Sequence, residues 1–445
     1  MGIFARLGGL TTSGKARVAV AWSLYDFANT IFSFVVVSSA IGLWLVADDR
    51  FGERDGNFVL SVAVVVSVGF NALVSPVLGA LSDRGGRRMP YLLFFTLLCI
   101  GPTMFIGLSA PVLGVVLFVV ANFGYQAALI YYDSTLKSVS KPATRGRLSG
   151  IGVAVGYMGT IFSGLLLLVL NVPLEGRFLV AGVLFAFFAI PIFIFVRESG
   201  PIGRVTWGDI LGSLGQLRTS VQHAREVPRL LRFLVARFFY SDAVNTIIVV
   251  MSIVTTKAKG LTDSQALIVL ISLTVAAIVA SFGWGYVVDR LGPRRTLMIV
   301  LTSWAVGLVL GAISLSVNGP IGIAMFLIAG AILGSGLGGV QVADRVLMVR
   351  LSPPERVGEF FGLYGLVGKG SQVVGQLLYG LTLLLFFDTL GVGAYQLAVL
   401  TLLVTMLIGA WLLRPVSDQW EGAGEVDVQA PPERLLPAAS PMEPR

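Results

Sequence analysis

The chain has little charge, one cysteine and one histidine for its length. Of its 445 residues only 13% are charged whereas 56% are hydrophobic, so we predict that most of the chain faces lipid or other membrane helices. The single Cys99 excludes an internal disulfide, and the single His223 argues against a histidine-built metal site. The sequence has no nucleotide-binding loop, metal-ligand cluster or nucleophile–base motif, so we predict no enzyme, cofactor or metal.

Long apolar runs occupy most of the chain. A helix needs about 20 apolar residues to cross a hydrocarbon core of about 30 Å. We count twelve such runs, which start near positions 18, 57, 90, 112, 148, 177, 231, 264, 296, 320, 357 and 393. The sequence therefore predicts an all-α membrane protein with twelve transmembrane helices.

The basic residues set the expected orientation. The formal net charge is +8, but the Lys and Arg residues are scattered among short loops, so we predict no nucleic-acid partner. Most of them fall on one side of the predicted spans, which places both termini in the cytoplasm by the positive-inside rule. We expect a plasma (inner) membrane protein whose first span is an anchor, because no small-residue cleavage site follows it.

A short basic turn occurs twice. The stretch GALSDRGGRR begins at Gly79, and GYVVDRLGPRR begins at Gly285, 206 positions later. Each reads as the end of one helix, a tight turn and the start of the next, with Pro293 in the second copy where Arg87 stands in the first. We predict an inner gate built from Gly79, Asp83, Arg84, Arg87, Arg88, Gly285, Asp289, Arg290 and Arg294, together with Asp344 and Arg345.

Other features also repeat between the two halves. Asp26 and Asn29 of the first span match Asp242 and Asn245 of the seventh, and several glycines recur 212 positions apart. A parallel duplication explains this pattern, with a substrate site near the midplane between two pseudo-symmetric six-helix bundles. The predicted divisions are a basic leader (1–17), a first bundle (18–197), an amphipathic linker (198–230), a second bundle (231–414) and a disordered cytoplasmic tail (415–445).

Charged residues inside the predicted spans mark the candidate site. Six ionisable side chains lie there, and each costs roughly 2.5–3.5 kcal/mol at the centre of a helix in lipid. They must face one another or a water-filled cavity; for Asp26 and Asp242 a purely structural contact between helices is the alternative. We predict a substrate or proton site formed by Tyr25, Asp26, Asn29, Gln126, Arg237, Tyr240, Asp242, Asn245 and Lys369. For Gln126, as for Tyr131 and Tyr132, a packing role fits equally well.

The repeated turn resembles the loop signature of the major facilitator superfamily. More specific segments are WSLYDFAN from Trp22, FFYSD from Phe238, QVADR from Gln341, and EFFGLYG from Glu359 followed by Lys369. Together they resemble the vacuole-effluxer branch of that superfamily, whose fungal members are autophagy-related permeases implicated in releasing amino acids from the vacuole. The resemblance implies the major facilitator fold and an amino-acid-type solute.

We therefore expect a monomeric secondary active transporter that moves a small polar solute by alternating access. Lys369 would hold a carboxylate, and Asp26 or Asp242 would meet an amine or carry a coupling proton. Two alternatives stay open: a solute sensor or receptor on a transporter scaffold, and a lipid flippase.

Overall fold

The computed structural model describes most of the chain. The described residues are 7, 9–84, 88–141, 145–198, 215, 218–353 and 356–418. At positions 76–77, 79–84, 137, 145–147, 149–150, 282 and 357–358 it describes the backbone only. Most of the predicted linker helix and the tail beyond position 418 lie outside the described residues.

Twelve helices within these ranges are long and apolar enough to cross a membrane, as predicted. The first and seventh spans are composite: α2 (Ala16–Ile31), η1 (Phe32–Ala40) and α3 (Ile41–Leu45) form one, and α10 (Pro228–Ile253) with η4 (Val254–Ala258) forms the other. The rest are α4 (Gly52–Arg84), α5 (Met89–Phe105) with η2 (Ile106–Leu108), α6 (Pro111–Val139), α7 (Arg145–Val169), α8 (Leu174–Phe195), α11 (Asp263–Leu291), α12 (Pro293–Ser316), α13 (Gly319–Leu351), α14 (Val357–Leu390) and α15 (Gly393–Leu413).

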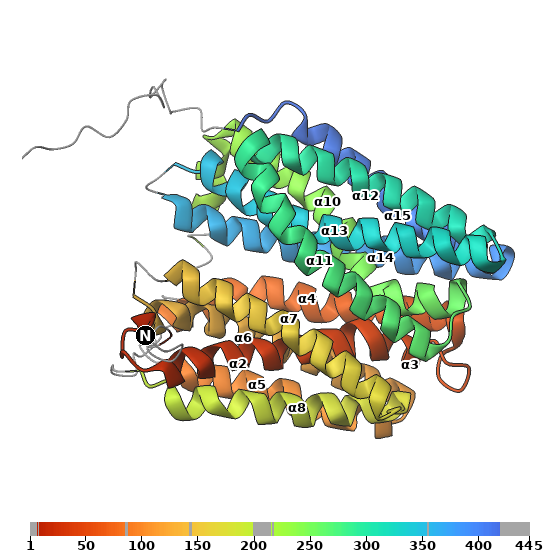
Figure 1. Cartoon of the computed structure of the whole chain (residues 1–445), viewed down its shortest axis with the longest axis horizontal. Helices are drawn as coiled ribbons and strands as arrows, with labels where there is room; N and C mark the ends of the chain where they lie inside the picture. Colours follow the sequence, from red (N-terminus) through yellow and green to blue (C-terminus); the bar gives the residue numbers. More distant parts are fainter. Residues whose placement is uncertain are drawn as a thin grey trace, which may run out of the picture.

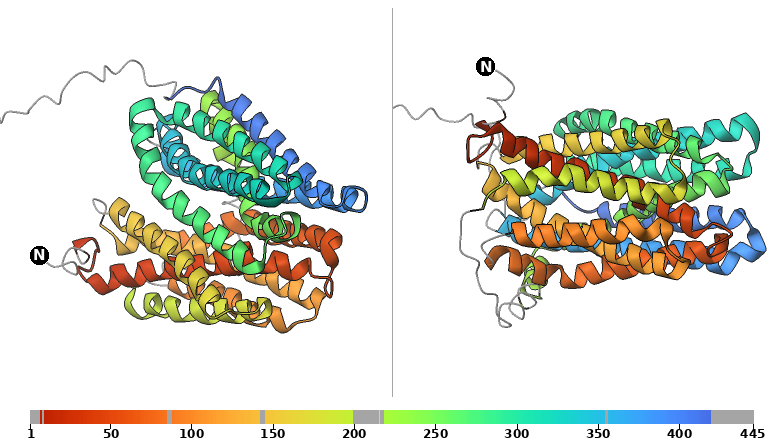
Figure 2. Two further views of the ribbon diagram at one scale, coloured as in Figure 1. Left: turned by 45° about the vertical axis from the view of Figure 1, so that its right-hand side comes forward. Right: turned by 90° about the horizontal axis from the view of Figure 1, so that it is seen from below.

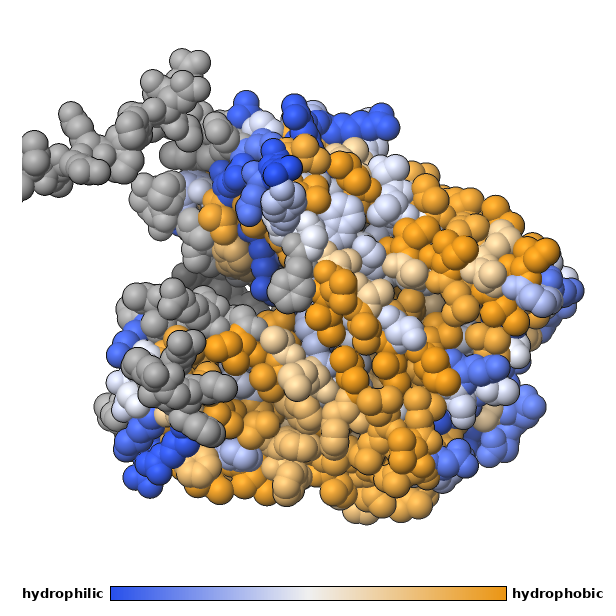
Figure 3. Space-filling model, in the orientation of Figure 1, coloured by the Kyte–Doolittle hydropathy of each residue, from blue (hydrophilic) through white to orange (hydrophobic). Residues whose placement is uncertain are grey.

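The helices form two bundles that lie side by side. Helices α2 to α8 make one bundle and α10 to α15 the other, and the bundles meet where α4 packs on α14 and α7 on α11 (Figures 1 and 2). We call the end where α2 begins and α15 finishes the terminal end, and the opposite end the distal end. Exposed Leu, Ile, Val and Phe side chains cover the outside, as lipid contact requires (Figure 3).

The composite spans lie at the centre of their bundles. Most residues of α2–α3 and of α10–η4 are buried, whereas most residues in the apolar windows of the other spans are not. Both composite spans contain π-helical turns; in η1 the Ser38 hydroxyl donates to the carbonyl of Ser33, five residues earlier, at 3.2 Å. Such turns loosen the regular helix and recur at functional sites.

A glycine row brings two helices of the second bundle together. On α13, a Cβ built at Gly334 would lie 2.8 Å from the carbonyl oxygen of Leu273, and one at Gly338 would lie 2.7 Å from that of Ala277. Both carbonyls belong to α11, so only a residue without a side chain allows this approach. The small-residue spacing visible in the sequence thus produces close contact between α11 and α13.

Candidate functional site

A cavity of about 270 Å³ lies between the bundles. Its walls come from α2, η1 and α7 of the first bundle and from α10, α11, α12 and α13 of the second. Most lining side chains are apolar, and the polar ones are Thr30, Ser33, Ser38, Tyr157, Thr160, Thr274 and Gln341. The cavity therefore offers hydroxyl and amide groups beside a large apolar wall, and none of the described residues that line it is charged.

Charged side chains gather beside this cavity, and we call Asp26, Asp133, Arg345 and Lys369 the charge cluster. Asp133 interacts electrostatically with Arg345 and Lys369, and also with Asp26. The acids belong to the first bundle and the bases to the second. Tyr157, which lines the cavity, interacts with Arg345 and Asp26 and so connects the two regions.

Two members of the charge cluster make contacts that fix their positions. Asp26 packs against Gly156, where an added Cβ would lie 3.3 Å from its carboxylate and 3.0 Å from the hydroxyl of Thr30. The Lys369 amine donates across the bundle boundary to Asn71 Oδ1 at 2.7 Å and to Ser75 Oγ at 3.1 Å. Lys369 therefore contacts α4 of the first bundle.

Three predicted residues form a separate network inside the second bundle. The buried carboxylate of Asp344 accepts hydrogen bonds from Arg237 Nε at 2.8 Å, from Tyr364 OH at 2.9 Å and from Tyr240 OH. The guanidinium of Arg237 also lies over the Tyr364 ring, 3.6 Å from its centroid. These donors satisfy the buried acid. Arg237 and Tyr240 thus do not line the cavity, and Asp344 pairs with Arg237 instead of forming a gate pair with Arg345.

Asp242 is buried away from the cavity lining. Its side chain packs against the backbone of Gly375, where a Cβ would lie 1.9 Å from Oδ1. Neither carboxylate oxygen makes a hydrogen bond of normal geometry within the described residues, although the side chain interacts with the Thr405 hydroxyl and the Gly375 N–H. Asn245, one turn further on, donates to the carbonyl of Gly368 at 3.5 Å.

The glycine contacts also show which positions of the two halves are equivalent in space. Gly156 on α7 meets Asp26, and Gly368 on α14, 212 positions later, meets Arg237. Asp26 therefore corresponds in space to Arg237, and the Asp-x-x-Asn repeat does not mark equivalent positions.

The remaining predicted site residues are not among those that line the cavity. Tyr25 is fully buried, shares a 2.7 Å hydrogen bond with Thr96, and stacks on Tyr132. Tyr131 stacks between other aromatic rings, so both tyrosines left open are packed. Asn29 is buried, and its Oδ1 has no hydrogen-bond partner within the described residues. Gln126 is half-buried.

The predicted inner gate is described only in part. Arg87 lies outside the described residues, and for Gly79, Asp83 and Arg84 only the backbone of α4 is described. In the second copy Gly292 has a φ of +82°, which favours glycine, and Pro293 begins α12, where its missing N–H costs nothing. Of the others, Asp289 is exposed, Gly285 is half-buried, and Arg290 lies 4.1 Å from the centroid of the Tyr286 ring.

Each of these turns contacts an acid that follows the last span of its own bundle. Glu198, after α8, accepts the backbone N–H of Arg88 and, at 2.9 Å, that of Met89. Asp418, after α15, accepts the N–H of Arg294 at 2.8 Å. Both acids thus cap the helix that follows the turn. Asp418 belongs to the segment predicted as tail, and its neighbour Val416 is buried.

Ion pairs join the bundles at the distal end. Arg177 at the start of α8 reaches the Asp263 carboxylate at the start of α11 with both terminal nitrogens. Glu53 on α4 lies 3.5 Å from Lys257 on η4. Arg54 lies 3.3 Å from Asp388, near the end of α14.

A polar cluster lies next to these pairs. Asn57 on α4 donates to Tyr395 OH at 3.1 Å and accepts from Tyr379 OH at 3.2 Å, and Tyr395 OH donates to Glu53 at 3.2 Å. At the terminal end the described residues show no ion pair between the bundles, and the surface is hollowed between them (Figure 3). The bundles are therefore closed at the distal end.

Asp133, Tyr157 and Gln341 were not predicted as site residues from the sequence. Asp133 was assigned to the loop after the fourth predicted span, whereas α6 continues to Val139 and contains it. The available signal was the repeat itself: Asp133 precedes Arg345 by 212 positions, the same separation that relates the glycines.

Comparison with known proteins identifies the family. The family model described as "Vacuole effluxer Atg22 like" matches residues 53–419. The chain belongs to the Atg22-like vacuole effluxer family. An uncharacterized MFS-type transporter, YxiO of Bacillus subtilis, is 24% identical over 90% of this chain and 94% of its own length. Autophagy-related protein 22 of Coccidioides immitis is 25% identical over 53% of this chain, and the match covers only 43% of the fungal protein.

Solved structures confirm the predicted fold of this Atg22-like chain. The nucleoside transporter NupG superposes with a TM-score of 0.70 over 90% of this chain and 98% of its own, at 13% identity. The D-xylose-proton symporter has a TM-score of 0.65 over 88% of this chain and 96% of its own, at 13% identity. With the match to the vacuole effluxer family and to an MFS-type transporter, the Atg22-like chain is a transporter of the major facilitator superfamily and not an enzyme.

Proposed function

We propose that this transporter moves a small zwitterionic solute, an amino acid first, by alternating access between its two bundles. The observation that carries the proposal is the charge cluster. It places two acids from the first bundle near two bases from the second, beside a cavity with a largely apolar wall. A zwitterion complements both signs at once, and the apolar wall accommodates an uncharged side chain.

The contacts at the distal end support an alternating mechanism. Three ion pairs and a cluster of polar side chains hold the bundles together there, so we propose that they form an outer gate that opens when the bundles rock. The predicted basic turns would act at the opposite end. We place both termini on the cytoplasmic side, because the terminal end carries most of the basic residues. We place the protein in a bacterial-type cell membrane, because the bacterial relative aligns along nearly its whole length.

We propose Asp242 as the site of a coupling proton. Its carboxylate is buried without a normal hydrogen bond within the described residues, and an unpaired ion in such a place costs several kcal/mol. A carboxyl that is neutral in this state and ionised once the bundles have rocked avoids that cost. The charge cluster would then bind solute, while Asp242 responds to the proton gradient.

The test is uptake into liposomes that contain the purified full chain. Labelled amino acids are screened by counterflow, then with and without an inward proton gradient. We expect Asp133→Asn and Arg345→Gln each to lower solute flux at least tenfold, while Asp48→Asn, an exposed acid with no ion pair in the described residues, leaves it unchanged. Equal flux in parent and both cluster variants would contradict the proposal.

The coupling role has its own measurement. Asp242→Asn should retain counterflow, which needs no net proton movement, and lose gradient-driven accumulation. Asp26→Asn should lose both activities, because Asp26 belongs to the charge cluster. Gradient-driven accumulation in Asp242→Asn would assign the proton to another group.

A further inference from the structure

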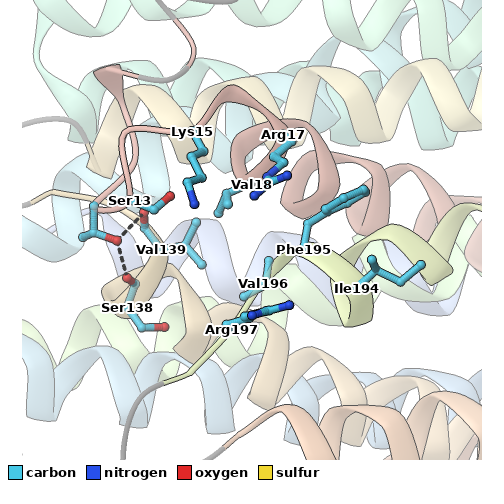
Figure 4. Close-up of a pocket in the computed structure, with 11 residues that line it drawn as sticks. Ser13, Lys15, Arg17, Val18, Ser138, Val139, Ile194, Phe195, Val196 and Arg197 are labelled. Atoms are coloured by element: carbon cyan, nitrogen blue, oxygen red, sulfur yellow. Dashed lines mark hydrogen bonds between the residues drawn. The ribbon is translucent and has the colours of Figure 1, made fainter.

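A second cavity, outside the bundle interface, has the composition of a phosphate site. It has a volume of about 290 Å³ and lies at the terminal end of the first bundle, where α2 begins and α6 and α8 finish. Three cations lie around it: Lys15 and Arg17 at the start of α2, and Arg197 just after α8 (Figure 4). Among the described residues that line it, none is acidic.

The three cations lack counter-charges. All are exposed, and within the described residues none forms an ion pair; Arg17 only lies over the Phe195 ring, 5.7 Å from its centroid. The acid next to Arg197 in sequence, Glu198, is engaged by the backbone at the start of α5. The cavity therefore has a net positive charge that an anionic ligand would neutralise.

Hydrogen bonds hold the leader in place around this cavity. The N–H of Thr12 donates to the carbonyl of Val139 at 2.9 Å, and its hydroxyl donates to that of Ser138 at 2.8 Å. Thr11 is fully buried and pairs with Ser140 in an isolated β-bridge. The wall made by residues 11–15 is thus built against the end of α6 and is not a loose terminus.

The start of α2 adds donors of the right kind. The side chain of its N-cap residue, Lys15, accepts no hydrogen bond from the N–H groups of the first turn, and no acidic residue lies in that turn. The N–H of Val18 donates to the Lys15 carbonyl at 3.1 Å, and the N–H groups that precede it, with the helix dipole, favour an anion. The hydroxyl of Ser13 lies on the same wall. A phosphate needs this combination of cations, hydroxyls and backbone N–H groups.

The apolar side of the cavity decides the source of the phosphate. Ile194 and Phe195 line it and are 56% and 39% exposed, on a helix whose outer face is otherwise covered by lipid-facing side chains. A soluble phosphate compound gains nothing from an exposed apolar wall, because it has no apolar chain to bury there. A phospholipid places its acyl chains on this wall and its headgroup among the cations.

We propose that this cavity binds the headgroup of an anionic phospholipid. The lipid would tie the leader and the start of α2 to the ends of α6 and α8, so that it stabilises the first bundle. Because α2 continues into η1, which lines the solute cavity, lipid binding would also act on transport.

The test uses the purified full chain in a neutral detergent, with three probes: phosphatidylglycerol, phosphatidylcholine and inorganic phosphate. Apparent affinity and the shift in thermal unfolding midpoint are measured for each. We expect saturable stabilisation by phosphatidylglycerol alone. Each cation replaced by glutamine should weaken binding about fivefold, so the triple variant Lys15→Gln, Arg17→Gln, Arg197→Gln should lose about a hundredfold.

A matched control removes the same charge elsewhere. Arg232, Arg295 and Arg350 are exposed at the terminal end of the second bundle, and their triple glutamine variant should bind phosphatidylglycerol like the parent. Ser13→Asp, which puts an acid into the cavity, should abolish binding, whereas Ser13→Asn should not. These single variants keep the test informative if the triple cavity variant does not fold.

Three results would overturn the proposal. The first is equal affinity of parent and Ser13→Asp for phosphatidylglycerol. The second is an equal loss in the control triple variant, which would indicate general attraction to a basic surface. The third is saturation by inorganic phosphate that displaces the lipid, which would assign the cavity to a soluble phosphate compound.

Discussion

The Arg177–Asp263 pair offers a direct test of the outer gate. The Arg177 side chain is 5% exposed and that of Asp263 is 43% exposed. Replacing Asp263 with Asn leaves the shape nearly unchanged but leaves a buried guanidinium without its counter-charge. Breaking a fully buried pair costs about 3–5 kcal/mol, and the exposure of Asp263 reduces this to about 1–2 kcal/mol. Because the pair joins the bundles only when the distal end is closed, the change favours the open state about tenfold.

The assay is a distance measurement between two spin labels. The labels are placed at Asp48 and Val392, exposed distal positions in different bundles, after the buried Cys99 is replaced with alanine. Asp263→Asn should add a longer distance to the distribution. Asp388→Asn is the matched control, because its pair with Arg54 is exposed on both sides and contributes less than about 1 kcal/mol. An unchanged distribution in Asp263→Asn, or an equal shift in Asp388→Asn, would refute the reasoning.

Three further predictions concern stability in detergent, read from thermal or denaturant unfolding. Gly375→Ala should destabilise the protein by about 1–3 kcal/mol, because its Cβ would lie 1.9 Å from a buried carboxylate oxygen. Gly362→Ala, with open space around its Cβ, should be near neutral. Equal unfolding midpoints for the two variants would contradict the close contact between Gly375 and Asp242. Tyr364→Phe should cost about 1–3 kcal/mol by removing a 2.9 Å donor to the buried acid of its network, and no loss would mean that the remaining donors suffice. Asp418→Ala should cost about 1 kcal/mol by uncapping α12, while Asp418→Asn should cost less.

The helices could be predicted from sequence because their signal is local. Each span needs only a run of apolar residues of sufficient length, and prolines at the first turns and glycines between helices mark the ends. The repeated turn and the glycine separation revealed the duplication. All twelve spans were therefore found from the chain alone.

The partners of the buried charges could not be predicted in the same way. Which charges meet depends on how each helix is rotated about its axis, and a shift of one residue turns a side chain by about 100°. The sequence showed only that the charges within the spans must face one another or a cavity, and the structure pairs Arg237 with Asp344. Lys369 likewise reaches Asn71 on the neighbouring bundle. The sequence shows that a buried charge needs a partner, but the rotation of each helix about its axis determines which residue that partner is.

The duplication also explains why the charge cluster has two signs. Asp133 and Arg345 lie 212 positions apart, as do Tyr157 and Lys369, so the members of each pair occupy equivalent positions in the repeat. The first bundle kept an acid and a phenol where the second has two bases. A symmetric pair of like charges facing one passage would repel and would favour an ion of one sign. Asp133 and Arg345 instead attract each other, and the zwitterion that we propose as solute would replace this interaction without leaving either charge unpaired.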